Sequence, residues 1–226
     1  MAKKTNKIDD QFGQVEEALS KTEQYIEDNQ KNLVRIVGGI VAIIALILGF
    51  NKFYLEPMNK EAQSEMFMAE LYFQKDSFQL ALDGDGQYYG FLDIIDEYSI
   101  TKSGNLANYY AGLSYLHLDE YEEAIDYLKE FSSDDILLST LALGCIGDAY
   151  LELGNTKKAL KFYTDASNNS DNSFTCPRFL FKQAMIHESN EDYKQALSLY
   201  KIIQSDFKTS HEGNGIEKYI SRIEDR

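Results

Sequence analysis

Proline and tryptophan are scarce in this chain: its 226 residues include two prolines and no tryptophan. Because proline interrupts the interior of a helix, its scarcity leaves room for long uninterrupted helices. The chain instead carries 16 tyrosines and 13 phenylalanines, whose side chains suit the interfaces between packed helices. Composition therefore favours an all-α fold with aromatic side chains between its helices.

Residues that carry chemistry are also few. Cys145 and Cys176 are the only cysteines, too few for the disulfide framework of a small secreted domain. Buried thiols are the simplest interpretation, and a bridge between them stays open. His117, His187 and His211 lie far apart, without neighbours at metal-ligand spacing. No nucleophile comes with a base and an orienting group. We therefore predict no enzyme activity, no catalytic residue, no metal, no cofactor and no small-molecule substrate.

Basic residues are outnumbered, with 22 Lys and Arg against 37 Asp and Glu, which gives a net charge of -15. Such a surface would repel a phosphate backbone, so nucleic acid is excluded as an expected partner. Residues 1–55 hold seven charges of each sign, so the whole acidic excess falls in residues 56–226. The chain is predicted to consist of two regions with different surroundings.

One long apolar run stands near the N-terminus. Ile36 to Phe50 is a stretch of fifteen residues without a polar side chain, and it extends to 33–55 if Arg35 and Lys52 direct their charges outward. About 22 helical residues span the hydrocarbon core of a bilayer. A buried core helix is the alternative, but this run is apolar on every face. We predict a transmembrane helix over 33–55 that contacts membrane lipid.

The flanks of this run decide between an anchor and a cleaved signal peptide. The apolar run starts after more than thirty residues and ends in NKFYLEP, whereas a signal peptide starts near a basic N-terminus and ends in a small-residue cleavage site. We expect a retained single-pass anchor. Lysines at positions 3, 4 and 7 favour a cytoplasmic N-terminus.

Residues 1–32 carry a heptad stripe that leads into the anchor. Its members alternate in steps of four and three residues: Ile8, Phe12, Val15, Leu19, Thr22, Ile26, Asn29 and Leu33. This spacing predicts a cytoplasmic amphipathic helix with one apolar seam. The seam could form a short coiled coil with a protein, or the helix could lie on the membrane surface.

The strongest signal in residues 56–226 is a small residue followed twelve positions later by alanine, four times over. The pairs are Ala69 and Ala81, Gly112 and Ala124, Gly147 and Ala159, and Ala184 and Ala196. The second members are 43, 35 and 37 residues apart, close to the period of about 34 in tetratricopeptide repeats (TPRs). YAGLSYLHLDEYEEAIDYL and LGCIGDAYLELGNTKKALKFY resemble this family closely.

The resemblance implies an α-solenoid of about four helix pairs, in which the small residues let the first helix (helix A) and the second (helix B) of each repeat approach closely. The repeat domain is predicted over 56–226, with repeats near 62–98, 105–138, 140–172 and 177–209 and a capping helix near 213–226. Between Asp83 and Asn105, a glycine-containing insertion replaces the regular end of the first repeat.

In TPR proteins the concave surface is lined by helix A, and the resemblance implies a groove there that binds a protein partner. The groove residues expected here are Phe73, Tyr109, Leu113, Leu116, Asp148, Leu151, Phe181 and Met185. These positions lack the Lys, Arg and Asn that hold a partner's C-terminal carboxylates in some relatives, so we expect hydrophobic or basic segments to bind. Alternatively, the insertion or the C-terminal helix covers part of this surface.

A cytoplasmic segment, one anchor and an acidic repeat domain that starts EPMNKEAQSEMFMAELYF together resemble the YfgM-like family of bacterial inner-membrane TPR proteins. The GDG insertion is similar to that of its Bacteroidota members. The resemblance implies an accessory subunit of the SecYEG translocon that acts with a PpiD-like chaperone, with the repeats in the periplasm. The alternatives are an adaptor for another cell-envelope complex and a sensor whose heptad segment relays binding inward.

Overall fold

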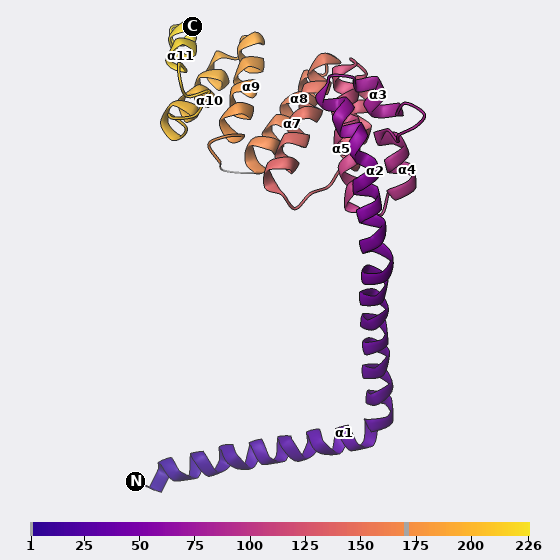
Figure 1. Ribbon diagram of the computed structural model, residues 1–226. Coiled ribbons are helices and arrows are strands. Elements are labelled where there is room, and N and C mark those ends of the chain that lie inside the picture. Colours follow the sequence, from indigo (N-terminus) through magenta and orange to yellow (C-terminus); the bar gives the residue numbers. More distant parts are fainter. Residues whose placement is uncertain (1, 170–171) are drawn as a thin grey trace. The chain divides into compact units, whose positions relative to one another are not determined.

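The computed structural model describes residues 2–169 and 172–226, with side chains from residue 23 onward except those of 25 and 27. It divides into two compact units, Met1–Pro57 and Met58–Arg226, which are considered separately. All regular elements of the described chain are helices (Figure 1). They are α1 (Ala2–Phe50), η1 (Asn51–Leu55), α2 (Glu56–Gln74), α3 (Phe78–Asp83), α4 (Phe91–Tyr98), α5 (Lys102–His117), α6 (Tyr121–Glu130), α7 (Ile136–Glu152), α8 (Thr156–Asn169), α9 (Cys176–Ser189), α10 (Tyr193–Asp206) and α11 (Glu217–Ile223).

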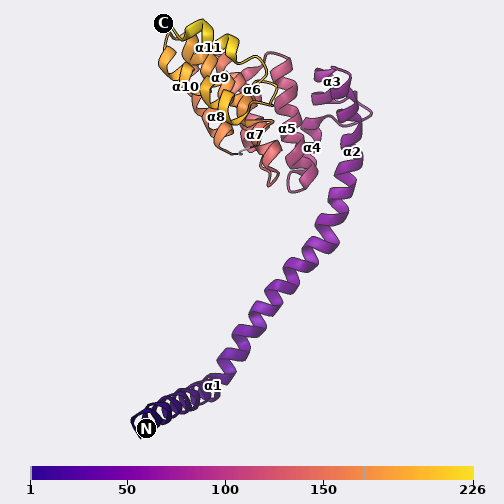
Figure 2. The ribbon, with the colours of Figure 1, turned by 90° about the vertical axis from the view of Figure 1, so that its left-hand side faces the viewer.

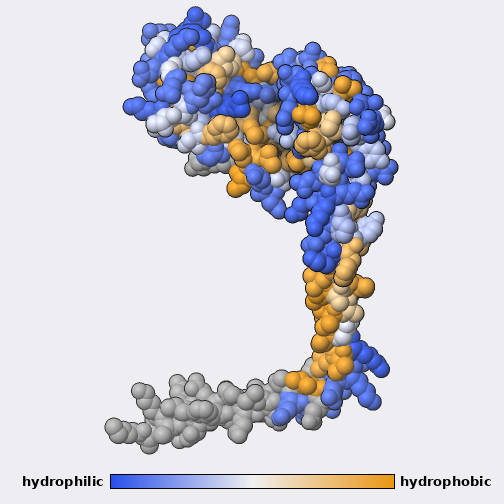
Figure 3. Space-filling view, in the orientation of Figure 1, coloured by the Kyte–Doolittle hydropathy of each residue, from blue (hydrophilic) through white to orange (hydrophobic). Residues whose placement is uncertain are grey.

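The first unit contains α1 and η1, a short π-helix that follows the apolar run. The apolar side chains between Val34 and Phe50 are exposed around the whole helix, and they form the orange band in Figure 3. Within the described residues, one helix is long and apolar enough to cross a membrane by length and composition, and its apolar window is unburied. The predicted heptad stripe lies mostly on side chains outside the described residues, so it stays a prediction.

The second unit is a stack of helix pairs, and the predicted all-α TPR-like solenoid is confirmed. Helix α5 packs on α6, α7 on α8 and α9 on α10, while α6 packs on α7 and α8 on α9 (Figures 1 and 2). The first pair is α2 and α3, which share a buried cluster that includes Met66, Ala69 and Ala81. The predicted repeat boundaries are not tested by these contacts and stay predictions.

The turn between the two helices of each pair has the same backbone geometry. One residue in each turn has a positive φ: Asp76, Asp119, Gly154 and Glu191, each five positions before the repeat's alanine. In the third pair, the amide of Asn155 donates to the carbonyl of Tyr150 at 2.8 Å and that of Gly154 donates to Leu151 at 2.9 Å. These two bonds form a Schellman motif, which satisfies the last carbonyls of helix A.

The eight small residues of the repeat pattern are all buried. At Gly112, an added Cβ would lie 2.5 Å from Cγ of Leu128, and at Gly147 it would lie 2.6 Å from Cε1 of Tyr163. Both neighbours lie on helix B, four residues after the repeat's alanine. The close approach of helix A to helix B therefore depends on the missing side chain at these positions.

The first repeat departs from the others because its helix B, α3, is only six residues long. A loop at 84–90 follows, in which Asp85 accepts hydrogen bonds from the amides of Gln87 and Tyr88 and from the hydroxyl of Tyr72. Helix α4 then packs on α3 and α5, with Phe91 and Ile94 fully buried. The insertion thus supplies apolar surface that the short α3 lacks.

The crossing at Gly147 yields a stability prediction. Gly147→Ala should lower the free energy of unfolding by about 1–3 kcal/mol because the new methyl group meets a fully buried ring. This loss should appear despite the gain of about 1 kcal/mol that alanine gives a helix interior. Urea unfolding of the full chain in mild detergent, followed by helical circular dichroism, measures it. Gly39→Ala is the control, since a Cβ there meets nothing within 4 Å; an equally stable Gly147→Ala protein would contradict the crossing.

The shared turn geometry yields a second prediction. Glu191 has a φ of 61°, a conformation in which glycine carries no Cβ penalty. Glu191→Gly should therefore stabilise the repeat unit by about 0.5–1 kcal/mol, and Gly154→Ala should destabilise it by a similar amount. Urea midpoints of the two variants against the wild type test both signs. A stabilised Gly154→Ala protein would show that the turn relaxes to another conformation.

Candidate protein-binding groove

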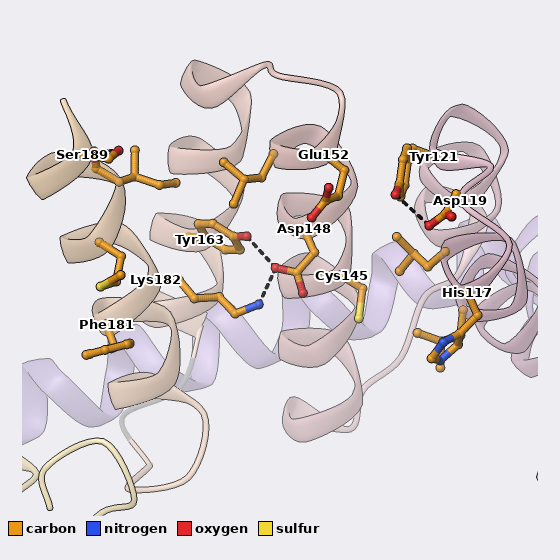
Figure 4. Close-up of a pocket in the computed structure, with 15 residues that line it drawn as sticks. His117, Asp119, Tyr121, Cys145, Asp148, Glu152, Tyr163, Phe181, Lys182 and Ser189 are labelled. Atoms are coloured by element: carbon orange, nitrogen blue, oxygen red, sulfur yellow. Dashed lines mark hydrogen bonds and ion pairs between the residues drawn. The ribbon is translucent and has the colours of Figure 1, made fainter.

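A groove with a volume of about 810 Å³ runs across the helix A side of the second, third and fourth repeats. Its residues come mainly from α5, α7 and α9 (Figure 4). The groove is lined by Leu113, Leu116, His117, Asp119, Tyr121, Cys145, Asp148, Leu151, Glu152, Tyr163, Phe181, Lys182, Met185, Ile186 and Ser189.

Helical spacing places these side chains on one face of each helix. Leu113 and Leu116 are three residues apart on α5, as are Asp148 and Leu151 on α7. Residues three and four apart lie on the same side of a helix, so each helix A presents a row to the groove. Leu151 is 39% exposed and Met185 41% exposed. Figure 3 shows apolar surface gathered between α5 and the C-terminal helices.

Asp148 is the polar centre of this groove. Its Oδ1 accepts a hydrogen bond from the hydroxyl of Tyr163 on α8 and forms an ion pair with Nζ of Lys182 on α9 (Figure 4). Tyr163 is fully buried, and burial together with the Asp148 hydrogen bond raises its pKa. The ring therefore stays neutral and remains a donor to the carboxylate at physiological pH.

The end of the groove near α5 is aromatic and acidic. The hydroxyl of Tyr121 donates to Asp119 at 2.8 Å, and this hydrogen bond raises the pKa of Tyr121. The ring of His117 stacks on that of Phe78, with centroids 4.2 Å apart and an angle of 3° between the planes. Glu152 adds a further carboxylate. This end therefore offers flat apolar surface beside negative charge.

Cys145 lines the groove beside Asp148. Burial raises the pKa of its thiol to about 12, and the charge of Asp148 acts in the same direction. Cys145 and Cys176 are not joined by a disulfide. Within the described residues, no group of three or more His, Cys, Asp or Glu side chains could hold a metal. The groove therefore offers surface and charge for binding rather than a reactive thiolate.

Six of the eight predicted groove residues line this groove: Leu113, Leu116, Asp148, Leu151, Phe181 and Met185. The other two, Tyr109 and the partly buried Phe73, pack against other aromatic rings. Tyr109 is 9% exposed and packs on Phe131 with ring centroids 5.1 Å apart. Phe73 belongs to an aromatic cluster with Phe78, Phe91 and Tyr110. The inserted α4 brings Phe91 into this cluster, so it contributes to covering Phe73.

Sequence reasoning missed the basic residue of the groove. Lys182 lies 34 residues after Asp148, whereas the repeat equivalent of Asp148 is Met185, so Lys182 stands about one helical turn earlier on α9. The same reasoning missed Tyr163, because its ring reaches the groove from helix B. Lys182 and Tyr163 both contact the carboxylate of Asp148, which is one of the predicted groove residues.

The C-terminal helix α11 covers the concave surface next to the groove. Arg222 contacts both oxygens of Glu188 on α9, each at 2.8 Å. Burial raises the pKa of Glu188, but hydrogen bonds from Arg222 and Tyr200 outweigh it, so this pKa lies below its ordinary value. Tyr219 of α11 meets Phe181 edge to face, with ring centroids 4.8 Å apart. Coverage of part of the concave surface by the C-terminal helix is the alternative expected from the sequence, and such coverage is found at Glu188.

Comparisons with known proteins agree with this architecture. Residues 106–134 and residues 143–170 each match a family model described as tetratricopeptide repeat. These segments fall on the second and third helix pairs. The chain therefore contains tetratricopeptide repeats. Repeats of this kind suggest a protein-binding scaffold, and the family is typically non-catalytic.

Two solved structures show the same fold. Both are crystal structures of nearly identical TPR-like repeats related to kinesin light chain from Podosopora anserina, and each is 12% identical to this chain. The first has a TM-score of 0.54 and covers 74% of this chain and 86% of its own. The second has a TM-score of 0.50 and covers 74% and 93%. No curated protein matches the chain.

The raised pKa of Cys145 predicts slow alkylation. With a pKa of about 12, about one thiol in ten thousand is ionised at about pH 8, against about one in four for an ordinary cysteine. Iodoacetamide should therefore modify Cys145 at least about a hundredfold more slowly in the folded chain than in urea, with the rate rising about tenfold per pH unit. Mass spectrometry of the Cys145 peptide measures this rate. Equal rates with and without urea would contradict the raised pKa of Cys145.

Proposed function

We propose that this chain is a membrane-anchored scaffold whose groove binds a segment of another protein. The observation that carries the proposal is the groove itself, an apolar concave surface on three A helices with a carboxylate at its centre. Clefts that combine apolar walls with a few placed polar groups are typical binding sites. The scaffold would act by holding its partner at the membrane rather than by changing it chemically.

The anchor is supported by the exposure of the apolar run. Ile36, Ile43 and Leu46 are 59%, 59% and 73% exposed, and a contiguous apolar surface of this kind is unfavourable in water. A lipid environment removes that cost, and 33–55 is long enough to span it. The division into a segment at 1–32, a membrane helix at 33–55 and a repeat domain at 56–226 is part of this proposal.

In the proposed membrane orientation, residues 1–32 lie in the cytoplasm of a bacterium and the repeats lie in the periplasm, on the other side of the inner membrane. This orientation is supported by the three lysines in the first seven residues. The positive-inside rule concerns basic residues near the ends of the membrane helix, so the acidic charge of the long repeat domain does not bear on the orientation. Protease added to intact spheroplasts should then remove the repeats and spare the N-terminal segment.

The finer proposal is an accessory role at the SecYEG translocon beside a PpiD-like chaperone, acting on secreted or membrane proteins. It is supported by the sequence resemblance and by a tether combined with a binding groove. A membrane anchor confines the groove to the surface where translocated segments emerge and so raises their effective concentration. An adaptor for another envelope complex would use the same tether and groove with a different partner.

Site-specific crosslinking tests whether the groove binds protein. A photoreactive amino acid in place of Leu116 should crosslink to protein partners in native membranes, because this side chain lines the groove. The same group in place of Lys194, which is exposed on α10, is the matched control. Equal crosslinking at both positions would contradict binding in the groove.

The identity of the complex is tested separately by affinity purification of the full chain after mild detergent extraction. Recovery of SecY and a PpiD-like protein is expected if the translocon role is right. Recovery of a different envelope complex would replace that role with the adaptor function, while groove crosslinks would still support the scaffold.

A further inference from the structure

The carboxylate of Asp148 is only partly engaged by its own chain. Within the described residues, Tyr163 and Lys182 both contact Oδ1 of Asp148, so these two polar contacts fall on one of its two carboxylate oxygens (Figure 4). The side chain of Asp148 is 38% exposed. A carboxylate accepts hydrogen bonds on both oxygens, so Asp148 retains the capacity to bind a second cationic group.

Lys182 is a replaceable partner for this carboxylate. Its side chain reaches from α9 to α7 and is 35% exposed. A lysine ammonium is a flexible, strongly hydrated point charge, and a half-exposed pair of this kind contributes little to stability. An arginine from a partner could instead contact both carboxylate oxygens at once, which is a stronger arrangement.

The surrounding charge favours a cation. Asp119, Asp148 and Glu152 line the groove, and Lys182 is the only Lys or Arg among the described lining residues. Once Lys182 is paired with Asp148, the carboxylates of Asp119 and Glu152 remain uncompensated within the lining. A partner segment with a positive charge is therefore attracted, and an acidic segment is repelled.

The chain already binds one such segment on the neighbouring part of the same surface. In α11, Arg222 pairs with Glu188 through both oxygens and lies over the ring of Tyr219 at 4.9 Å. Tyr219 in turn contacts Phe181, which also lines the groove. An apolar side chain next to an arginine is thus the chemistry that this concave surface accepts from its own chain.

We propose that Asp148 selects a partner segment carrying an arginine or lysine within an apolar stretch, and that Lys182 occupies the position of the partner's cation while the groove is empty. The inference rests on the proposed protein-binding function and names the chemistry of the bound segment. Leucine or aromatic side chains of the segment would contact Leu113, Leu151 and Met185, while its cation displaces Lys182 from Asp148.

The probe is a fluorescent synthetic peptide of about fifteen residues, with leucines at helical spacing and one central arginine. Its twin carries citrulline, which keeps the size and planar shape of arginine without the charge. Binding is measured by fluorescence anisotropy with the full-length chain in nanodiscs. The arginine peptide should bind the wild type at least about tenfold more tightly than the citrulline peptide.

Two variants assign this preference to the proposed pair. Asp148→Asn should abolish the preference for the arginine peptide over the citrulline peptide. Lys182→Met removes the competing cation and should tighten arginine binding about threefold or more. Asp165→Asn makes the same charge change on α8 outside the groove lining, and it should retain the full preference.

Each alternative outcome has a distinct meaning. Equal binding of both peptides to the wild type would overturn the inference and leave the protein-binding groove in place, whereas binding of neither would overturn both. Loss of both peptides in a folded Asp148→Asn chain would show a structural role and overturn the selection. If that variant does not fold, the wild-type preference and Lys182→Met decide, and weaker arginine binding by Lys182→Met would overturn the proposal.

Discussion

The repeat unit depends on how closely helix A approaches helix B. Gly147 has no side chain at the point where the ring of Tyr163 crosses, and Gly112 has none where Leu128 crosses. These contacts set the distance between helix A and helix B in the second and third pairs. That distance in turn determines the spacing between neighbouring A helices. The Tyr163 ring also donates its hydroxyl to Asp148. The residue that fills the interface therefore also supports the charged centre of the groove.

The sequence predicted the features that repeat locally. The alanine spacing identified the helix pairs because each pair needs a small residue at a fixed distance along the chain. The positive φ values recur at one position of each repeat, although a positive φ at Glu191 carries no sequence signal of its own. Period and register are properties of neighbouring residues, so a single sequence is enough to reveal them.

The groove could be predicted only in part. Residues on exposed faces of α5, α7 and α9 were found by position within the repeat, whereas Phe73 and Tyr109 turned inward against aromatic rings from an inserted helix and from the end of α6. The pairing of Lys182 with Asp148 depends on how two helices distant in sequence face each other. Such contacts follow from packing between elements, which periodicity does not specify.

The coverage of Glu188 by α11 limits how much of another chain this surface can hold. Three neighbouring A helices at the usual separation extend about 20 Å, enough for about six extended residues or about thirteen helical ones. A footprint that short gives modest affinity for any single segment. Lasting association would then depend on confinement of both molecules to one bilayer, with many brief encounters in place of one durable complex.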